Sequence, residues 1–390
     1  MKKILEIESS LKNITAINCG LLNGYFSLSF FYAYANKTDN IYLQDEMNNS
    51  IQNAIELFSD KTTTHTFCDG LAGSCWGLSH LVKKNKIDAN LDELLCDIEN
   101  HLETTSSHDF QVNYFDFLHG GLGACIYFLD RLPNKKAELY LIQTVKLLNE
   151  KANRTSDGAW WENTYIKLND DSTSIECNCG LSHGMPSIIW FLSKCYTCNI
   201  EREKCLDLLN DSVNWLIKKK SINNNYKSIY PIAIGNGLPL LGTRLAWCYG
   251  DLGIATTIWQ AGIALNNNDW KQEAIDIMLH SAKRRDLKEN GVLDAGICHG
   301  TAGIAHIFNR FYKETGLKEF DEARWYWINE TLNMATHKDG LAGYKAWQAE
   351  KGWQNEYGLL EGVSGIGLVL LGFLTDDVED LSWDRCLLLS

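Results

Sequence analysis

Apolar residues along this chain follow two patterns that alternate. In the first pattern nearly every position is apolar, as in residues 124–129 and 188–192. A helix with this composition must be buried on several sides. In the second pattern apolar residues recur on one side only, as between Leu206 and Ile217, with polar residues on the opposite face. We therefore predict buried inner helices that alternate with half-exposed outer helices.

A short turn pattern precedes each buried run: a glycine followed three places later by glycine or serine. The first glycines of its seven copies are Gly24, Gly70, Gly120, Gly184, Gly250, Gly300 and Gly362. Successive copies lie 46 to 66 residues apart, enough for two helices of roughly 11 to 12 residues or somewhat longer. The chain thus predicts an all-α fold of seven helical hairpins. The glycines either permit close packing and positive backbone angles, or mark a functional face.

Seven hairpins can stack as an open superhelix or close into a ring. An open stack needs polar capping repeats, but the last repeat is apolar throughout residues 366–373. The sequence therefore favours a closed ring, with all the glycine turns at one end. No interval has room for an inserted domain, and the longer ones hold extended loops such as Thr155–Thr173. We expect a single domain over residues 1–390.

The composition excludes several classes of function. The formal charge of −13 and pI of about 5.3 argue against a nucleic-acid partner, because such binding depends on Lys and Arg at phosphates. We expect neither a signal peptide nor a membrane span, because acidic residues come before any apolar region of signal-peptide length and no segment has about 18 consecutive apolar residues. We expect a cytoplasmic protein whose 13 cysteines are reduced thiols.

The candidate chemistry lies directly before the turn glycines, in what we call the slot position. The slot residues are Asn23, Asp69, His119, His183, Tyr249, His299 and Glu361. One place further back stand Cys248 and Cys298. Two thiolates and one imidazole commonly bind zinc, and three protein ligands leave one position open for catalysis. From spacing alone, two buried cysteines and a hydrogen-bonded histidine are an equal alternative.

Three strings resemble the motifs of the lanthionine synthetase C-like family. They are Trp247-Cys248-Tyr249-Gly250, Cys298-His299-Gly300 with Gly303, and Ser182-His183-Gly184 with Pro186. The repeated turns extend the resemblance over the whole chain. It implies an α/α toroid, with one catalytic Zn²⁺ per chain bound by Cys248, Cys298 and His299. It also implies an enzyme that forms thioether rings, a lanthipeptide cyclase.

The resemblance further implies a mechanism and three catalytic residues. A substrate cysteine becomes a zinc thiolate and attacks the β-carbon of dehydroalanine or dehydrobutyrine. The resulting enolate is protonated by an acid, for which His183 is the candidate. Asp116 would orient or tune a site residue, and Arg244 would stabilise the enolate charge. Without the resemblance, His183 and Asp116 would be helix caps and Arg244 a surface or salt-bridge arginine.

The same resemblance bears on other residues and on the partners of the protein. His119 stands where related sequences often carry an acidic residue; it is either a second acid or base or a structural histidine. Cys177 and Cys179 lack an evident third ligand, and we expect them to be structural. The chain has no room for a dehydratase. The implied partners are therefore a dehydrated precursor peptide and a separate dehydratase.

Three other functions compete with the cyclase. A related enzyme on the same scaffold would add glutathione to dehydrated residues in proteins. A toroidal prenyltransferase-like protein also activates a thiol with zinc, but it normally uses an aspartate ligand that the set here lacks. A non-catalytic peptide-binding toroid would use zinc only for structure, with four protein ligands.

Overall fold

A helix follows each of the seven turns in the computed structural model, which describes residues 1–36, 41–162, 177–220, 227–235 and 241–390. These inner helices are α2 (Tyr25–Ala35), α4 (Leu71–Lys83), α6 (Leu122–Asp130), α8 (Met185–Thr197), α10 (Asp251–Ala264), α12 (Thr301–Thr315) and α14 (Val363–Gly372). Six begin directly after the first turn glycine, whereas α6 begins one residue later, after Gly121. The predicted positions of the buried helices are confirmed.

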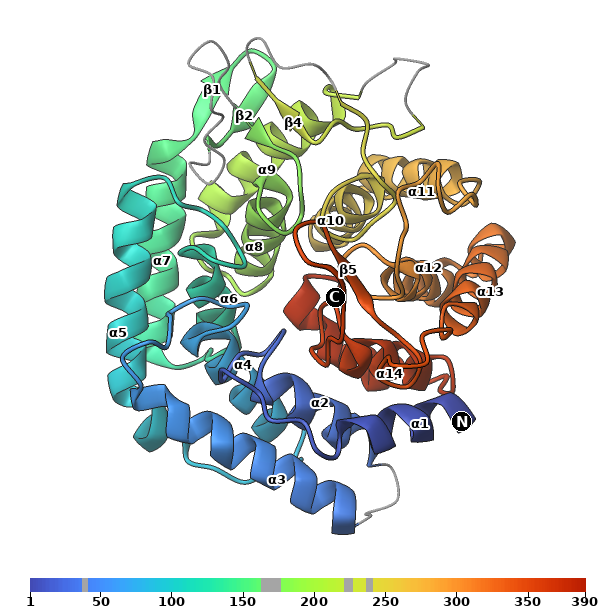
Figure 1. The fold of residues 1–390 in the computed structure, drawn as a ribbon. Helices are drawn as coiled ribbons and strands as arrows, with labels where there is room; N and C mark the ends of the chain where they lie inside the picture. Colours follow the sequence, from blue (N-terminus) through green and yellow to red (C-terminus); the bar gives the residue numbers. More distant parts are fainter. Residues whose placement is uncertain (37–40, 163–176, 221–226, 236–240) are drawn as a thin grey trace. The chain divides into compact units, whose positions relative to one another are not determined.

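The outer helices alternate with the inner ones along the chain (Figure 1). They are α3 (Ile41–Glu56), α5 (Leu91–Gln111), α7 (Lys135–Lys151), α9 (Arg202–Ile217), α11 (Asn268–Ser281) and α13 (Lys318–Asn333). All ten residues of α14 are buried, but only five of the 16 in α13 are. This difference in burial is what the two apolar patterns predicted.

The remaining elements are short. A helix, α1 (Lys2–Leu11), begins the chain, and two 3-10 helices are η1 (Leu57–Ser59) and η2 (Glu379–Leu387). Three antiparallel pairs join β1 (Asn153–Thr155) to β2 (Gly158–Trp160), β3 (Cys177–Asn178) to β4 (Ala233–Ile234), and β5 (Ala346–Gln348) to β6 (Gly352–Gln354). The expected extended loop at Thr155–Thr173 thus contains part of a β-hairpin, and its residues 163–173 lie outside the described residues.

The chain divides into two compact units. Unit 1 contains Met1–Ile98 and Leu287–Leu387, and unit 2 contains Glu99–Asp286 and Leu388–Ser390. The expectation of a single domain stays a prediction. Within unit 2, α8 packs on α6, α9 and α10. Within unit 1, α14 packs on α2, and the backbone N–H of Leu360 donates to the carbonyl of Leu22 at 2.9 Å. This contact between the last and first repeats is one that an open stack lacks.

Close packing explains the turn glycines. A Cβ on Gly300 would lie 2.4 Å from the backbone nitrogen of Gly296, and one on Gly303 would lie 1.9 Å from the carbonyl oxygen of Ile297. Of the seven first glycines only Gly250 has a positive φ, 121°. The lack of a side chain, rather than an unusual backbone angle, is therefore what most of these positions require.

No helix in the described part of the chain is both long and apolar enough to cross a membrane.

Candidate metal and acid–base site

The slot residues share a distinctive exposure. All seven are partly exposed, whereas the turn glycine that follows each of them is buried. A helix then begins with its first N–H groups, and with the positive end of its dipole, beside the slot. Loop carbonyls accept hydrogen bonds from several of these N–H groups, as from Thr301 and Ala302, so the slot side chain is the partly exposed polar group beside each helix start.

His183 and Asp116, two of the predicted catalytic residues, lie together in unit 2. His183 directly precedes Gly184 at the start of α8, and Asp116 lies in the loop before α6. The Nδ1 atom of His183 is 2.6 Å from Oδ2 of Asp116, a carboxylate that is fully buried. The other oxygen of Asp116, Oδ1, accepts a hydrogen bond of 2.7 Å from the backbone N–H of His119. Asp116 is thus both a local cap and the partner of His183.

Two aromatic rings flank His183. The ring of His119 stacks on it with centroids 5.7 Å apart, and the ring of Tyr249 lies at 5.9 Å. The hydroxyl of Tyr249 accepts a hydrogen bond of 3.0 Å from the side-chain amide of Asn178. Sequence reasoning left the role of His119 open and gave none to Tyr249. Both residues occupy slots, and the shared position was the signal that they would lie near His183.

Arg244 is not brought to this pair. Its side chain is exposed and makes no hydrogen bond or ion pair with any other described residue. Its backbone carbonyl packs against Gly250, where a Cβ would lie 2.6 Å from that oxygen. The predicted role of Arg244 at the enolate stays a prediction.

The predicted metal ligands offer the donors that zinc prefers. Cys248, Cys298 and His299 carry two thiol sulfurs and one imidazole nitrogen, a donor set typical of zinc. Cys248 belongs to unit 2 and precedes α10, and the other two belong to unit 1 and precede α12. Cys248 is 8% exposed, while Cys298 and His299 are half-buried. The chemistry of the donor set therefore fits a zinc ion.

Cys177 and Cys179 are not part of that donor set. Both are buried, and the sulfur of Cys177 lies 3.6 Å from the sulfur of Met185 at the start of α8. These contacts fit the structural role expected from the sequence.

Sequence reasoning missed Asp294, a buried carboxylate beside a predicted ligand in unit 1. Its Oδ2 lies 3.6 Å from Nε2 of His299. The same oxygen accepts a hydrogen bond of 2.9 Å from the backbone N–H of Trp347 in β5, and Oδ1 accepts one of 3.0 Å from Gly296. Asp294 thus contacts both the β5–β6 hairpin and the turn that carries His299.

A sequence signal for Asp294 exists. Asn18, Asn178 and Asp294 each stand six residues before a turn glycine, and each is followed two places later by another glycine. In all three, the side-chain Oδ1 accepts a hydrogen bond from the N–H of that second glycine. This Asx-turn pattern marks residues that shape the turn, and only at Asp294 is its side chain a carboxylate.

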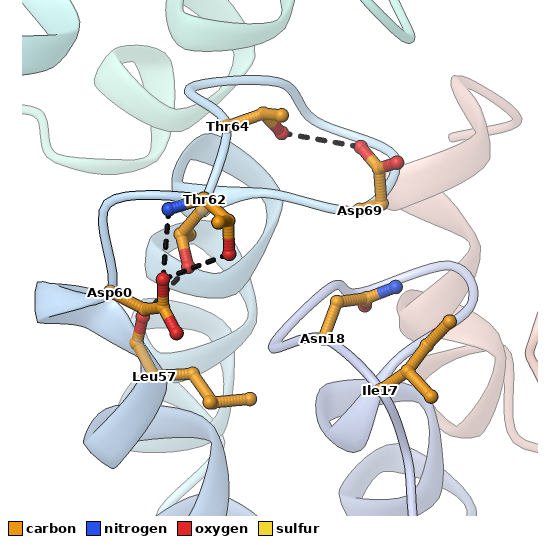
Figure 2. Close-up of a pocket in the computed structure, with 8 residues that line it drawn as sticks. Ile17, Asn18, Leu57, Asp60, Thr62, Thr64 and Asp69 are labelled. Carbon is orange, nitrogen blue, oxygen red and sulfur yellow. Dashed lines mark hydrogen bonds between the residues drawn. The ribbon is translucent and has the colours of Figure 1, made fainter.

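The slot before α4 shows what the same turn does with an aspartate in place of a histidine. Asp69 lines a pocket of about 140 Å³ in unit 1, together with Asp60, Thr62 and Thr64 (Figure 2). Asp69 accepts hydrogen bonds from the hydroxyls of Thr64 and Thr66, and Asp60 accepts from the N–H and hydroxyl of Thr62. Residues of the same loop thus hydrogen-bond both carboxylates, and none of the predicted site residues lines this pocket.

Residues 15–388 match the family described as lanthionine synthetase C-like protein. The chain belongs to this family. The match covers nearly all of the described residues in both units, so the resemblance of three short strings holds along the whole sequence.

Individual relatives refine the assignment. The nisin biosynthesis protein NisC of Lactococcus lactis subsp. lactis is 25% identical over 369 residues, which cover 87% of this chain and 82% of the relative. Glutathione S-transferase LANCL1 of Danio rerio is 26% identical over 136 residues, or 35% of this chain and 31% of the relative. The solved structure of nisin cyclase matches with a TM-score of 0.75 and 21% identity, covering 100% of this chain and 96% of nisin cyclase. The structural match confirms the predicted fold class, the all-helical α/α toroid.

Proposed function

We propose that this protein is a zinc-dependent lanthipeptide cyclase. Its substrate would be a precursor peptide in which Ser and Thr have been dehydrated, and its product a peptide with lanthionine or methyllanthionine rings. Two similarities support the proposal: family membership over residues 15–388, and the likeness to a nisin biosynthesis protein over 87% of the chain. The observation that carries it is the hydrogen-bonded pair of His183 and Asp116, which has the geometry of an acid oriented by a carboxylate.

Cys248, Cys298 and His299 would hold the zinc ion. Their two sulfurs and one nitrogen suit zinc better than Mg²⁺ or Ca²⁺, which prefer oxygen ligands. Zinc bound with one open position would lower the pKa of a coordinated thiol, so that the substrate cysteine reacts as a thiolate. The helix N-termini that follow both cysteines would also favour the deprotonated sulfurs.

His183 would supply the proton that completes the addition. The new carbon–sulfur bond forms at the β-carbon of the dehydro residue, and the π electrons move toward the α-carbon and its carbonyl. In the imidazolium form of His183, Asp116 accepts a hydrogen bond from Nδ1–H, and Nε2–H is left to donate a proton to the α-carbon. The proton that the substrate thiol loses would pass to solvent, from which Nε2 is protonated again. Arg244, whose side chain is exposed, would approach the enolate oxygen only once the peptide is bound.

The products of the reaction define its test. Cyclisation consumes one free thiol per ring and leaves the mass of the peptide unchanged. We expect the purified protein with zinc to protect the cysteines of a dehydrated precursor peptide from thiol alkylation, as measured by mass spectrometry. Peptide that stays fully alkylated in the presence of zinc-loaded protein would exclude the cyclase function.

The same assay separates the competing functions. Supplying glutathione with a dehydrated protein substrate would add the mass of glutathione if the chain resembled the zebrafish relative in activity. That relative matches only 35% of this chain, so we expect no such adduct. A non-catalytic toroid would bind peptide but protect no thiol. Because the proposed substrate already carries dehydrated residues, a separate dehydratase would act before this protein.

A further inference from the structure

We infer that Asp294 is a positioning residue that orients His299 so that its Nδ1 atom, and not Nε2, binds the metal. The inference rests on the proposed zinc site and deepens it, because it names the ring nitrogen and the residue that selects it.

The carboxylate of Asp294 is buried beside His299. The side chain of Asp294 is 3% exposed, and its Oδ2 faces Nε2 of His299 at 3.6 Å. This distance is longer than a hydrogen bond but lies within the range of an ion pair. A ring nitrogen that faces a buried carboxylate is the one that carries hydrogen, since two lone pairs would repel. Nε2–H is therefore the favoured tautomer, and it leaves the lone pair on Nδ1.

Hydrogen bonds from the backbone hold Asp294 itself in place. Its two oxygens accept hydrogen bonds from the backbone N–H groups of Gly296 and Trp347, at 3.0 and 2.9 Å. Its backbone carbonyl accepts a third, of 3.1 Å, from the first residue of α12, Thr301. A carboxylate fixed in this way has one orientation to offer to His299. Carboxylates that orient a metal-binding histidine typically contribute 10- to 100-fold to metal affinity.

Asp294 also connects the proposed metal ligand His299 to the β5–β6 hairpin. The N–H group that holds Oδ2 belongs to Trp347, which pairs across the hairpin with Trp353. Trp353 and Asp294 both line a pocket of about 280 Å³ in unit 1, along with His337 and Met334. Displacement of the hairpin would therefore change the position of the carboxylate that orients His299.

The test compares zinc affinity in two isosteric variants. In Asp294→Asn the amide has only one acceptor oxygen, so its NH₂ group must face an N–H of Trp347, Gly296 or His299. We expect about a 10- to 100-fold loss of zinc affinity in competition with a chromophoric chelator. The matched control is Asp339→Asn, which removes an exposed carboxylate that pairs with Lys345 and should leave zinc affinity unchanged. Equal affinity of Asp294→Asn and the unsubstituted protein would overturn the inference.

A second measurement does not depend on a substitution of Asp294. In the unsubstituted, ¹⁵N-histidine-labelled protein with zinc, the NMR signals that disappear in His299→Gln should show a protonated Nε2 and a metal-bound Nδ1. A metal-bound Nε2 would overturn the inference and leave the zinc site intact. Failure of the unsubstituted protein to bind zinc at all would instead remove the proposed function, and the inference with it.

Discussion

Two histidines stand in the same slot of different repeats and face aspartates in different ways. His183 in unit 2 presents Nδ1 to Asp116, a residue 67 positions away that comes from another repeat. His299 in unit 1 presents Nε2 to Asp294, which lies five positions earlier in its own loop. Both histidines are partly exposed, and both precede a buried glycine and a helix start.

The difference shows how one scaffold position supports two kinds of chemistry. A carboxylate selects which ring nitrogen carries hydrogen and thereby which one is free to act. At His183 the free atom is Nε2, which suits proton transfer to a bound peptide. At His299 it is Nδ1, which suits a metal ligand. The proposed roles follow from the direction of the aspartate, and four predictions test this comparison.

The largest effect is expected where a proposed ligand is removed. Cys298→Ala should lose more than about 100-fold in zinc affinity, beyond the effect of an orienting residue, and should lose cyclisation with it. The measurement is zinc content per chain after dialysis, beside the unsubstituted protein. A variant that keeps one zinc per chain would show that Cys298 is not a ligand.

His183→Ala should lose activity without losing metal. We expect cyclisation to fall by about 10²- to 10⁴-fold, the usual contribution of a general acid, while zinc content stays unchanged. The matched control is His119→Ala, which removes the stacked neighbour of His183 but not its hydrogen bond to Asp116. An equal loss in both variants would mean that the aromatic stack, and not a specific acid, matters.

Exchanging the two aspartates for asparagine should separate the two roles. Asp116→Asn should lower the rate of cyclisation by about 10²-fold or more at unchanged zinc affinity, because His183 loses its orienting partner. Asp294→Asn should show its primary defect in zinc affinity. The measurements are the rate of cyclisation at saturating zinc and the zinc affinity of both variants. The comparison would be contradicted if Asp116→Asn lost zinc affinity and Asp294→Asn lost only the rate of cyclisation.

The smallest effects test whether the turns at the two slots have the same backbone geometry. Gly184→Ala and Gly300→Ala should each destabilise the fold by about 1–3 kcal/mol, because the new Cβ would lie 2.1 Å from the Asn178 carbonyl oxygen and 2.4 Å from the Gly296 nitrogen. Ser187→Ala, which loses one hydroxyl hydrogen bond, should cost about 1 kcal/mol or less. Urea unfolding of the three variants gives these values. A cost far larger at one glycine than at the other would show that the turns differ in more than their aspartates.

Local patterns in the sequence predicted much of the fold and of the candidate site. The spacing of glycines and the change from all-round to one-sided apolar runs predicted the inner and outer helices, because burial sets which faces of a helix are apolar. The histidines in the slots and the cysteines one position before them were equally evident. Each lies at a fixed offset from a turn glycine, which no side chain can replace without a close contact. The proposed acid, His183, and its partner Asp116 were named through the family resemblance.

Only the tertiary structure decided which groups face one another. Nothing in the sequence tells that Nδ1 of His183 meets Asp116, or that Nε2 of His299 meets Asp294, because a side chain's direction depends on packing against residues far away in the chain. The Asx turn at Asp294 was visible as a pattern, but its contact with Trp347, 53 positions later, was not. Amino-acid sequence determines where polar residues stand along a helix start, whereas the fold determines which of their atoms remain free for chemistry.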